Sequence, residues 1–264
     1  MNERQGTGLV APIHLAAEQG KLAVVQYLIE NGAKASIADA NGWTPLHFCA
    51  QGGTPQHAAI ASLVIDADAD VAVDARTSSS LTPLHIAAQH AESVDLVQML
   101  VRHGANINAR DDKGNAPIHW AARKGRVHCA YSLIKCGANA SAQNHQGWNA
   151  LHAAAHEGAR SRSVVTLLSK MDAEWGALRG AKTAGGKRPC DICSTSVRAD
   201  LHTLFDAAHM GDLAAVKTSM AKGDKVSSAR ILFVAITAAD GHLAPQRAHA
   251  ATGHGANTVD PSEA

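Results

Sequence analysis

One short motif returns along the chain at a nearly constant spacing, and this regularity limits the folds that are open to it. Residues 44–47 and 82–85 both have the sequence Thr-Pro-Leu-His, and three looser copies also end in a histidine. Consecutive motif histidines lie 33, 38, 34 and 33 residues apart, at His14, His47, His85, His119 and His152. A sequence with such a period folds as stacked copies of one small unit, because no single unit can bury its apolar face alone.

The motif has the chemistry of a helix start. Thr44 supplies a hydroxyl at the N-cap, and Pro45 follows at the first helical position, where its missing N–H costs no hydrogen bond. Ala50 and its counterparts are small enough for neighbouring helices to approach closely. Apolar residues at helical spacing in the first unit predict helices over residues 12–19 and 22–30.

The sequence Thr-Pro-Leu-His-x-Ala at a period near 33 residues resembles the ankyrin-repeat family. The resemblance implies an all-α fold, an ankyrin-repeat solenoid of stacked helix-turn-helix units with projecting β-hairpin loops, which becomes degenerate towards the C-terminus. In that family the motif histidine bonds to its turn and to neighbouring repeats, so the motif residues are expected to be structural. These residues are His14, Thr44, Pro45, His47, Thr82, Pro83, His85, His119 and His152.

The motif copies divide the chain into segments. Residues 1–170 are expected to form five ankyrin repeats, and residues 171–186 an irregular connection. A degenerate repetition continues over 187–257, where Asp191 takes the place of the motif histidine, and the tail 258–264 is expected to be disordered. The five repeats run over about 8–40, 41–78, 79–111, 112–144 and 145–170.

The second repeat departs from the regular unit. Its extra residues fall in loops, where added length costs little free energy. Ser80 also stands where other repeats carry a glycine in the hairpin turn, as at Gly42 and Gly114. Because glycine adopts positive φ without steric cost, we expect the tip that contains Ser80 to differ in shape.

Composition and charge narrow the functional classes. Hydrophobic residues make up 46% of the chain but aromatic residues only 3%, which suits thin stacked helices with a core of small aliphatic side chains. A net charge of +1 gives no electrostatic basis for binding nucleic acid or an anionic membrane. Five cysteines without a disulfide framework indicate a reducing compartment. With no secretory segment and no apolar run of the ~18 residues that span a bilayer, we expect an intracellular protein, cytoplasmic or nuclear.

Two short motifs resemble reactive sites but lack required residues. Cys190 and Cys193 have the spacing of half a zinc site, but no second cysteine pair follows. Residues 181–188 resemble a phosphate-binding loop, but Arg188 stands where a serine or threonine would meet magnesium. Neither motif therefore predicts a metal or a nucleotide.

Acidic and histidine clusters are equally incomplete. The aspartates at 66, 68 and 70 resemble a calcium loop in which Val71 replaces the required glycine. His152 and His156 lie one helical turn apart, but His152 is a motif residue, and His242, His249 and His254 have no carboxylate or cysteine partners. We therefore expect no catalytic residues, no metal and no cofactor, and predict that the chain is not an enzyme.

Ankyrin arrays commonly bind proteins through hairpin tips and the exposed part of the first helix, so the resemblance points to those positions here. Trp43 and Trp148, at two tips, are the strongest candidates for partner binding because exposed tryptophans often anchor interfaces. The alternative is that each indole packs on its own hairpin or the adjacent tip, and Trp120 is expected in the core. The expected partner-binding residues are Trp43, Gln51, Gln89, His90, Asp112, Lys113, Arg123, Lys124, Trp148, His156 and Glu157.

The function predicted from the sequence is a non-enzymatic protein–protein interaction scaffold, which binds a protein partner on the concave face and hairpin tips. We expect a monomer that neither binds nucleic acid nor inserts into membranes. The alternatives are a two-sided adaptor whose degenerate repeats at 187–257 recruit a second protein, and an accessory subunit of an enzyme complex.

Arg123, Lys124 and Arg126 form a local basic spot that could select an acidic segment. Asn108 resembles the hairpin asparagine that asparaginyl hydroxylases modify in some ankyrin proteins, although a structural hydrogen bond would explain it equally well.

Overall fold

The structure is a computed structural model that describes residues 9–68, 71–90, 94–171 and 177–193. The chain divides into two units, Met1–His202 and Thr203–Ala264, and every helix described below belongs to the first. Several expectations from the sequence fall outside the described residues. They concern positions 1–8, Asp70, positions 172–176 of the irregular connection, positions 194–257 of the degenerate repeats with His242, His249 and His254, and the tail 258–264.

Two rows of helices make up the array. The first row contains α1 (Pro12–Glu18), α3 (Pro45–Gly52), α5 (Pro83–His90), α7 (Pro117–Arg123), α9 (Ala150–Glu157) and α12 (Pro189–Ile192). The second row contains α2 (Leu22–Glu30), α4 (Pro55–Ala67), α6 (Val94–Arg102), α8 (Val127–Lys135) and α10 (Arg162–Met171). The short helices η1 (Gly158–Ser161) and α11 (Ala177–Gly180) complete the described elements. We number the successive pairs, from α1–α2 to α9–α10, as repeats one to five.

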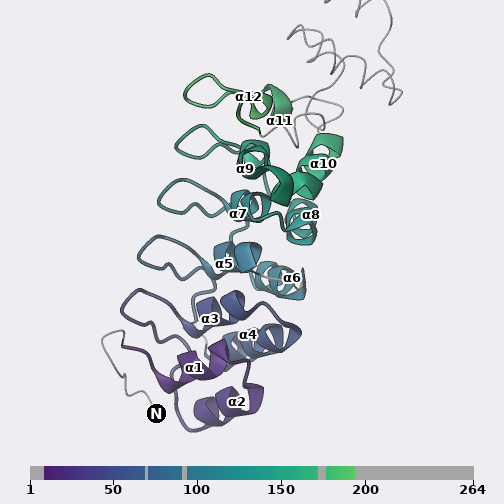
Figure 1. The fold of residues 1–264 in the computed structure, drawn as a ribbon. Coiled ribbons are helices and arrows are strands. Elements are labelled where there is room, and N and C mark those ends of the chain that lie inside the picture. Colours follow the sequence, from purple (N-terminus) through teal and green to yellow (C-terminus); the bar gives the residue numbers. More distant parts are fainter. Residues whose placement is uncertain (1–8, 69–70, 91–93, 172–176, 194–264) are drawn as a thin grey trace, which may run out of the picture. The chain divides into compact units, whose positions relative to one another are not determined.

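Each helix packs against the same helix of the next repeat. In the first row α1 contacts α3, α3 contacts α5, and the series continues through α7 and α9 to α12; the second row stacks in the same way from α2 to α10. Figure 1 shows the two rows side by side, with the loops between repeats projecting from one side. Every regular element of the described residues is a helix, so the predicted all-α solenoid is confirmed.

Small residues allow this close stacking. The first row buries alanine pairs such as Ala87 and Ala88, whereas the second row buries larger aliphatic side chains such as Leu100 and Leu133. The buried side chains form one cluster, so the core extends through the whole described stack. Within the described residues, no helix has the length and apolar character needed to cross a lipid bilayer.

The projecting tips close through turns that their own side chains stabilise. In repeat two the carboxylate of Asp39 accepts hydrogen bonds from the backbone N–H groups of Asn41 and Trp43, at 2.8 and 2.7 Å. Gly42 adopts a φ of 78°, and an added Cβ would lie 2.9 Å from the carbonyl oxygen of Arg76 in the next repeat. Both the backbone conformation and the close approach of the neighbouring tip require glycine there.

The tip that contains Ser80 keeps the shape of the glycine tips, so the prediction that it would differ is wrong. Ser80 adopts a φ of 57°, and its N–H donates to the carbonyl oxygen of Thr77 at 2.8 Å, as that of Gly42 donates to Asp39. The N–H of Ser78 donates to the carbonyl oxygen of Asn41 in the preceding tip at 2.8 Å. Contacts on both sides of Ser80 thus hold a left-handed conformation that a serine would not favour alone.

Candidate protein-binding surface

Each motif histidine from His47 to His152 bonds to two repeats at once. The Nδ1 atom of His47 accepts a hydrogen bond from the backbone N–H of Thr44 at 3.1 Å and lies 2.9 Å from the Thr44 hydroxyl. Its Nε2 atom lies 3.1 Å from the carbonyl oxygen of Leu81 in the next repeat. Because a backbone N–H can only donate, Nδ1 is unprotonated and Nε2 carries the hydrogen. His47 therefore caps its own helix and joins it to the following repeat.

His85, His119 and His152 share this geometry, whereas His14 bonds to a carbonyl group of its own repeat. The four Nε2 atoms lie 3.0–3.2 Å from carbonyl oxygens, those of Ile37 for His14, Asn115 for His85, Trp148 for His119 and Lys187 for His152. Burial lowers the pKa of His47 to about 4. Burial also lowers the pKa of His85, His119 and His152. A neutral imidazole with both nitrogens engaged holds the array together and offers no lone pair to a metal or a substrate.

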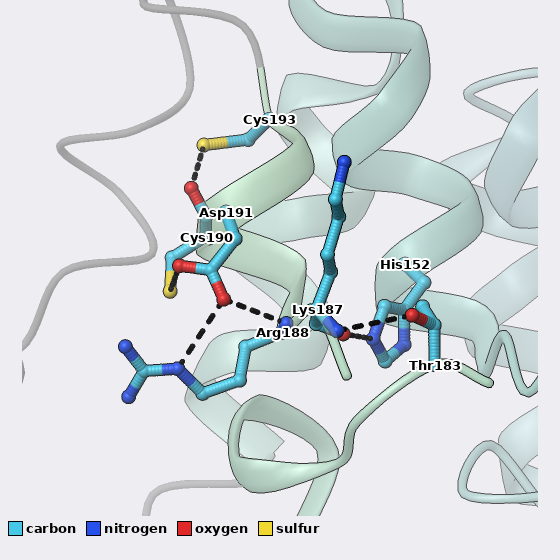
Figure 2. A network of polar contacts seen from close by, with 7 residues as sticks. All are labelled: His152, Thr183, Lys187, Arg188, Cys190, Asp191 and Cys193. Atoms are coloured by element: carbon cyan, nitrogen blue, oxygen red, sulfur yellow. Dashed lines mark hydrogen bonds and ion pairs between the residues drawn. The ribbon is translucent and has the colours of Figure 1, made fainter. Parts of the chain in front are cut away.

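At the start of α12, Asp191 takes the position of the motif histidine (Figure 2). Oδ2 of Asp191 accepts from the backbone N–H of Arg188 at 2.8 Å and lies 3.5 Å from Nε of the same residue. Burial opposes ionisation of Asp191, but the hydrogen bond from the N–H and the charge of Arg188 lower its pKa overall. The carboxylate caps α12 as imidazoles cap the earlier helices, but it has no N–H to donate to a further repeat.

The motifs that resemble metal sites are engaged in local contacts. The thiol of Cys193 donates to the carbonyl oxygen of Cys190 at 3.1 Å (Figure 2). His152 and His156 do not converge, because His152 bonds within the array whereas the ring of His156 lies 5.1 Å from that of Trp148. Across the part of the chain that the structure describes, no three His, Cys, Asp or Glu side chains are grouped so as to hold a metal ion.

The two tip tryptophans are half-buried and pack on first-row helices of their own repeats. The ring of Trp43 lies 5.3 Å from that of Phe48 and 5.8 Å from that of His47, both in α3. The ring of Trp148 packs on His156 in α9, as described above. Part of each indole stays accessible, and Trp148 also lines the hollow described next.

A hollow of about 230 Å³ opens between repeats four and five, and we call it the tryptophan hollow. Trp120 and Trp148 supply its aromatic surface, and Lys113, Arg123 and His156 supply basic groups. The remaining lining residues are Asn115, His119, Asn144, Gln146 and Ala153. Tips and first helices of two neighbouring repeats thus contribute to one concave surface.

Hydrogen bonds hold the side chains of this hollow in place. The indole N–H of Trp120 donates to the carboxylate of Asp111 at 3.0 Å. The guanidinium of Arg123 lies 5.8 Å from the centre of the Trp120 ring, and its Nε donates to Glu157 at 3.0 Å. The predicted core position of Trp120 is correct only in part, because the ring packs against the core on one side and lines the hollow on the other.

A second hollow of about 220 Å³, the tip hollow, lies between the tips of repeats three and four. It is lined by Ser79, Leu81, Asp111, Asp112, Lys113 and Trp120. Lys113 and Trp120 line both hollows, so these form one continuous surface. The N–H of His145 donates to the carbonyl oxygen of Lys113 at 3.0 Å, which fixes the tip of repeat four against the next tip.

A third hollow of about 370 Å³ lies where the first helices of repeats three to five end, and we call it the basic hollow. It is lined by Gln89, His90, Lys124, Arg126 and Arg160. Burial lowers the pKa of His90, and the positive charges of Lys124 and Arg126 lower it further. Consecutive residues line the two hollows: Arg123 lines the tryptophan hollow and Lys124 lines the basic hollow.

Most of the predicted partner-binding residues lie on these three hollows. Eight of them line a hollow: Gln89, His90, Asp112, Lys113, Arg123, Lys124, Trp148 and His156. Glu157 joins the surface through its bond to Arg123, whereas Trp43 and Gln51 lie in repeat two, outside the three hollows. Arg160 is missing from the predicted set because η1, which places it here, has no counterpart in the other repeats.

Asn108 joins the loops of two repeats. Its side-chain oxygen accepts from the backbone N–H of Asn139 at 2.9 Å, and its own N–H donates to the side chain of Asn106 at 3.0 Å. The residue is exposed. The structural explanation for this asparagine therefore has a specific contact, and its modification stays a prediction.

Comparison with known sequences gives one family and several partial relatives. Residues 13–111 and 84–177 match the family described as ankyrin repeats (3 copies), which together is more than half of the chain. The chain is 31% identical over 128 residues to palmitoyltransferase AKR1 of Lachancea kluyveri, and 32% identical over 128 residues to alpha-latrocrustotoxin-Lt1a of Latrodectus tredecimguttatus. It is 33% identical over 132 residues to neurogenic locus notch homolog protein 1 of Homo sapiens. These matches cover 48%, 48% and 50% of this chain but only 17%, 9% and 5% of the relatives, so the chain spans less than a fifth of their length.

Proposed function

The chain belongs to the ankyrin-repeat family, and from that membership we propose that it is a non-enzymatic scaffold whose partner binds to the tips and first helices of repeats three to five. Ankyrin repeats are in general protein-interaction modules, so the class of partner follows from the family. The geometry of this chain supports the proposed location of the surface and its anchoring residues.

The tryptophan hollow carries the proposal. Its volume of about 230 Å³ is smaller than the ~300–1,000 Å³ of small-molecule and cofactor sites, so it suits one inserted side chain of a partner. Trp120 and Trp148 offer the apolar walls for such an anchor, and Lys113 and Arg123 offer charged groups at its rim. Central aromatic residues with a polar rim are typical of the few positions that dominate binding energy at interfaces.

The surface is already ordered before a partner arrives. The hydrogen bond from Trp120 to Asp111 fixes one indole, and the contact with His156 fixes the other. Because the lining side chains have little freedom left to lose, binding costs less conformational entropy on the side of the array. Such rigid presentation supports recognition of an extended or helical segment that a flexible surface would bind more weakly.

The relatives support a binding role without transferring an activity. A palmitoyltransferase, a latrocrustotoxin and a notch protein share this stretch, and it is a small part of each. Whatever each whole protein does, the shared stretch is the repeat array, and ankyrin arrays are generally not catalytic. We therefore assign the chain to protein binding rather than to acyl transfer, and the adaptor alternative depends on 187–257, most of which lies outside the described residues.

The test compares partner capture by three forms of the full chain. Immobilised wild type, Trp148→Ala and Tyr131→Ala are incubated with cell lysate, and bound proteins are quantified by mass spectrometry. Tyr131 is an exposed aromatic on α8, in the second row, and serves as the matched control. We expect a partner that Trp148→Ala loses and Tyr131→Ala keeps, with at least a tenfold weaker affinity once that partner is purified. Retention of every captured protein by a folded Trp148→Ala variant would refute the proposed site.

A further inference from the structure

The basic hollow collects permanent positive charge from two successive repeats, beside a histidine of the repeat before them. His90 ends α5 of repeat three, Lys124 and Arg126 lie between the helices of repeat four, and Arg160 lies in η1 of repeat five. None of the described residues that line the hollow is a carboxylate. The corresponding turn in repeat two, residues 52–54, has the sequence Gly-Gly-Thr and carries no charge, so this concentration of charge is local.

These cations have no acidic partner within the described part of the chain. Lys124, Arg126 and Arg160 form no ion pair with any carboxylate there. Arg123, one residue before Lys124, is different because Glu157 accepts from its Nε at 3.0 Å. The charge of Arg123 is therefore neutralised, whereas the charges of Lys124, Arg126 and Arg160 are not, and a ligand of opposite charge would neutralise them.

Backbone contacts fix the three turns against one another. Nε of Arg126 donates to the carbonyl oxygen of Gln89 at 3.2 Å, which joins repeat four to repeat three. An added Cβ on Gly125 would lie 2.3 Å from the carbonyl oxygen of Arg160, and the hydroxyl of Ser161 donates to the carbonyl oxygen of Arg123 at 3.1 Å. The elements that carry the cations are therefore held close together without a ligand.

We propose that the basic hollow is an anion site that binds an acidic segment, rich in Asp and Glu, of the protein partner. The inference rests on the proposed function, since the same partner would place its anchor in the adjoining tryptophan hollow. Guanidinium groups bind carboxylates through paired hydrogen bonds, and Arg160 and the remaining N–H groups of Arg126 are available for this. Burial is the main cause of the lowered pKa of His90, and the further lowering by Lys124 and Arg126 agrees with a positive local potential.

A protein segment fits this surface better than a nucleic acid. Proteins that bind nucleic acid with high affinity commonly neutralise about six to ten phosphates, whereas this hollow offers three permanent cations. The chain as a whole carries a net charge of only +1. A short run of carboxylates matches the number and spread of the cations, which come from consecutive repeats.

The direct test measures binding of a fluorescein-labelled octaglutamate peptide to the full chain by fluorescence anisotropy. We expect wild type to bind with an affinity that falls as salt rises, and Lys124→Ala/Arg160→Ala to bind about tenfold more weakly. Arg102→Ala/Lys135→Ala removes the same charge from exposed positions on α6 and α8 and should change the affinity less than twofold. Arg160→Lys keeps the charge but not the paired hydrogen bonds, so its affinity should lie between those of wild type and Lys124→Ala/Arg160→Ala.

Three results would overturn the inference. They are no binding of octaglutamate by wild type, equal loss in the two double variants, and tighter binding of an oligothymidylate of the same length with the same dependence on Lys124 and Arg160. The partner captured from the lysate distinguishes failure of this inference from failure of the proposed function. Loss of that partner in Trp148→Ala but not in Lys124→Ala/Arg160→Ala refutes the anion site alone. If Trp148→Ala keeps the partner, that result refutes only the tryptophan hollow. Octaglutamate binding that depends on Lys124 and Arg160 would still support the anion site in that case.

Discussion

The motif of repeat three and the motif at residues 188–191 build the same helix start from different groups. In repeat three, Nδ1 of His85 accepts from the N–H of Thr82 at 3.1 Å, and Nε2 lies 3.0 Å from the carbonyl oxygen of Asn115. At the later motif, Asp191 accepts from the N–H of Arg188 at 2.8 Å but has no hydrogen to donate onwards. The motif therefore has two separable tasks, capping a helix and joining repeats, and only the imidazole performs both.

Acid should destabilise the repeats that are capped and joined by histidines, and this is the largest effect that we expect. The pKa of His47 is about 4 in the folded chain, against 6.5 for an unperturbed histidine. Between those values the unfolded chain binds more protons, so the free energy of unfolding decreases as the pH falls through this window. His47 alone accounts for on the order of 3 kcal/mol, because burial strongly disfavours its charged form. Urea unfolding followed by circular dichroism, near pH 7 and near pH 4.5, measures the loss.

The aspartate cap should be almost unaffected between these two pH values, because its stability is lost only at lower pH. The pKa of Asp191 is lowered from 3.8, so the carboxylate keeps its charge, and its hydrogen bond to Arg188, while the histidines become protonated. His85, His119 and His152 shift in the same direction as His47 and add to the loss of stability. Equal stability of the array at the two pH values would contradict neutral, buried motif histidines.

Removing one imidazole tests the two tasks together. His85→Ala leaves the N–H of Thr82 and the carbonyl oxygen of Asn115 without their partner in a buried site, and it also opens a cavity. We expect a loss of about 3 kcal/mol in the free energy of unfolding from urea titration. His128→Ala, at an exposed position on α8, is the matched control and should change stability by less than about 0.5 kcal/mol. A similar effect of both variants would remove the structural role assigned to the motif.

Removing the carboxylate tests capping alone, so the effect should be smaller. Asp191→Ala loses the acceptor for the N–H of Arg188 but breaks no bond to another repeat among the described residues. We expect about 1 kcal/mol of local destabilisation, seen as faster hydrogen exchange around residues 183–193 with little change around repeat three. Asp191→Asn retains an acceptor and should restore part of the protection. Faster exchange throughout the stack would show that Asp191 also joins repeats.

The repeated part of the fold could be predicted from the sequence because each motif residue acts through neighbours at fixed spacing. Thr44, Pro45 and His47 lie within one turn of a helix, so their order alone determines how the helix begins. The family assignment followed from the same residues. The candidate surface was less predictable, since a hollow depends on which half-buried side chains from adjacent repeats converge.

Trp120 and Arg160 show why that convergence is not visible in the sequence. Trp120 follows a motif histidine in a buried helix, but its ring reaches the surface because Asp111, nine residues earlier, accepts its N–H. Arg160 joins the basic hollow because η1 packs on Gly125 of the preceding repeat. Both positions depend on contacts between elements rather than on periodicity.

The smallest expected effect concerns the tip of repeat three, whose shape was predicted incorrectly from the glycine pattern. Ser80 holds a φ of 57° because bonds to Thr77 and between neighbouring tips fix the turn, although a left-handed conformation disfavours a side chain. Ser80→Gly should therefore raise the free energy of unfolding by a few tenths of a kcal/mol, up to about 1, since relief of strain is partly offset by a more flexible unfolded chain. Gly42→Ala is the reverse change and should destabilise, because its Cβ would lie 2.9 Å from the carbonyl oxygen of Arg76. Differential scanning calorimetry of both variants measures the pair, and a stability loss in Ser80→Gly would mean that the serine side chain itself supports the turn.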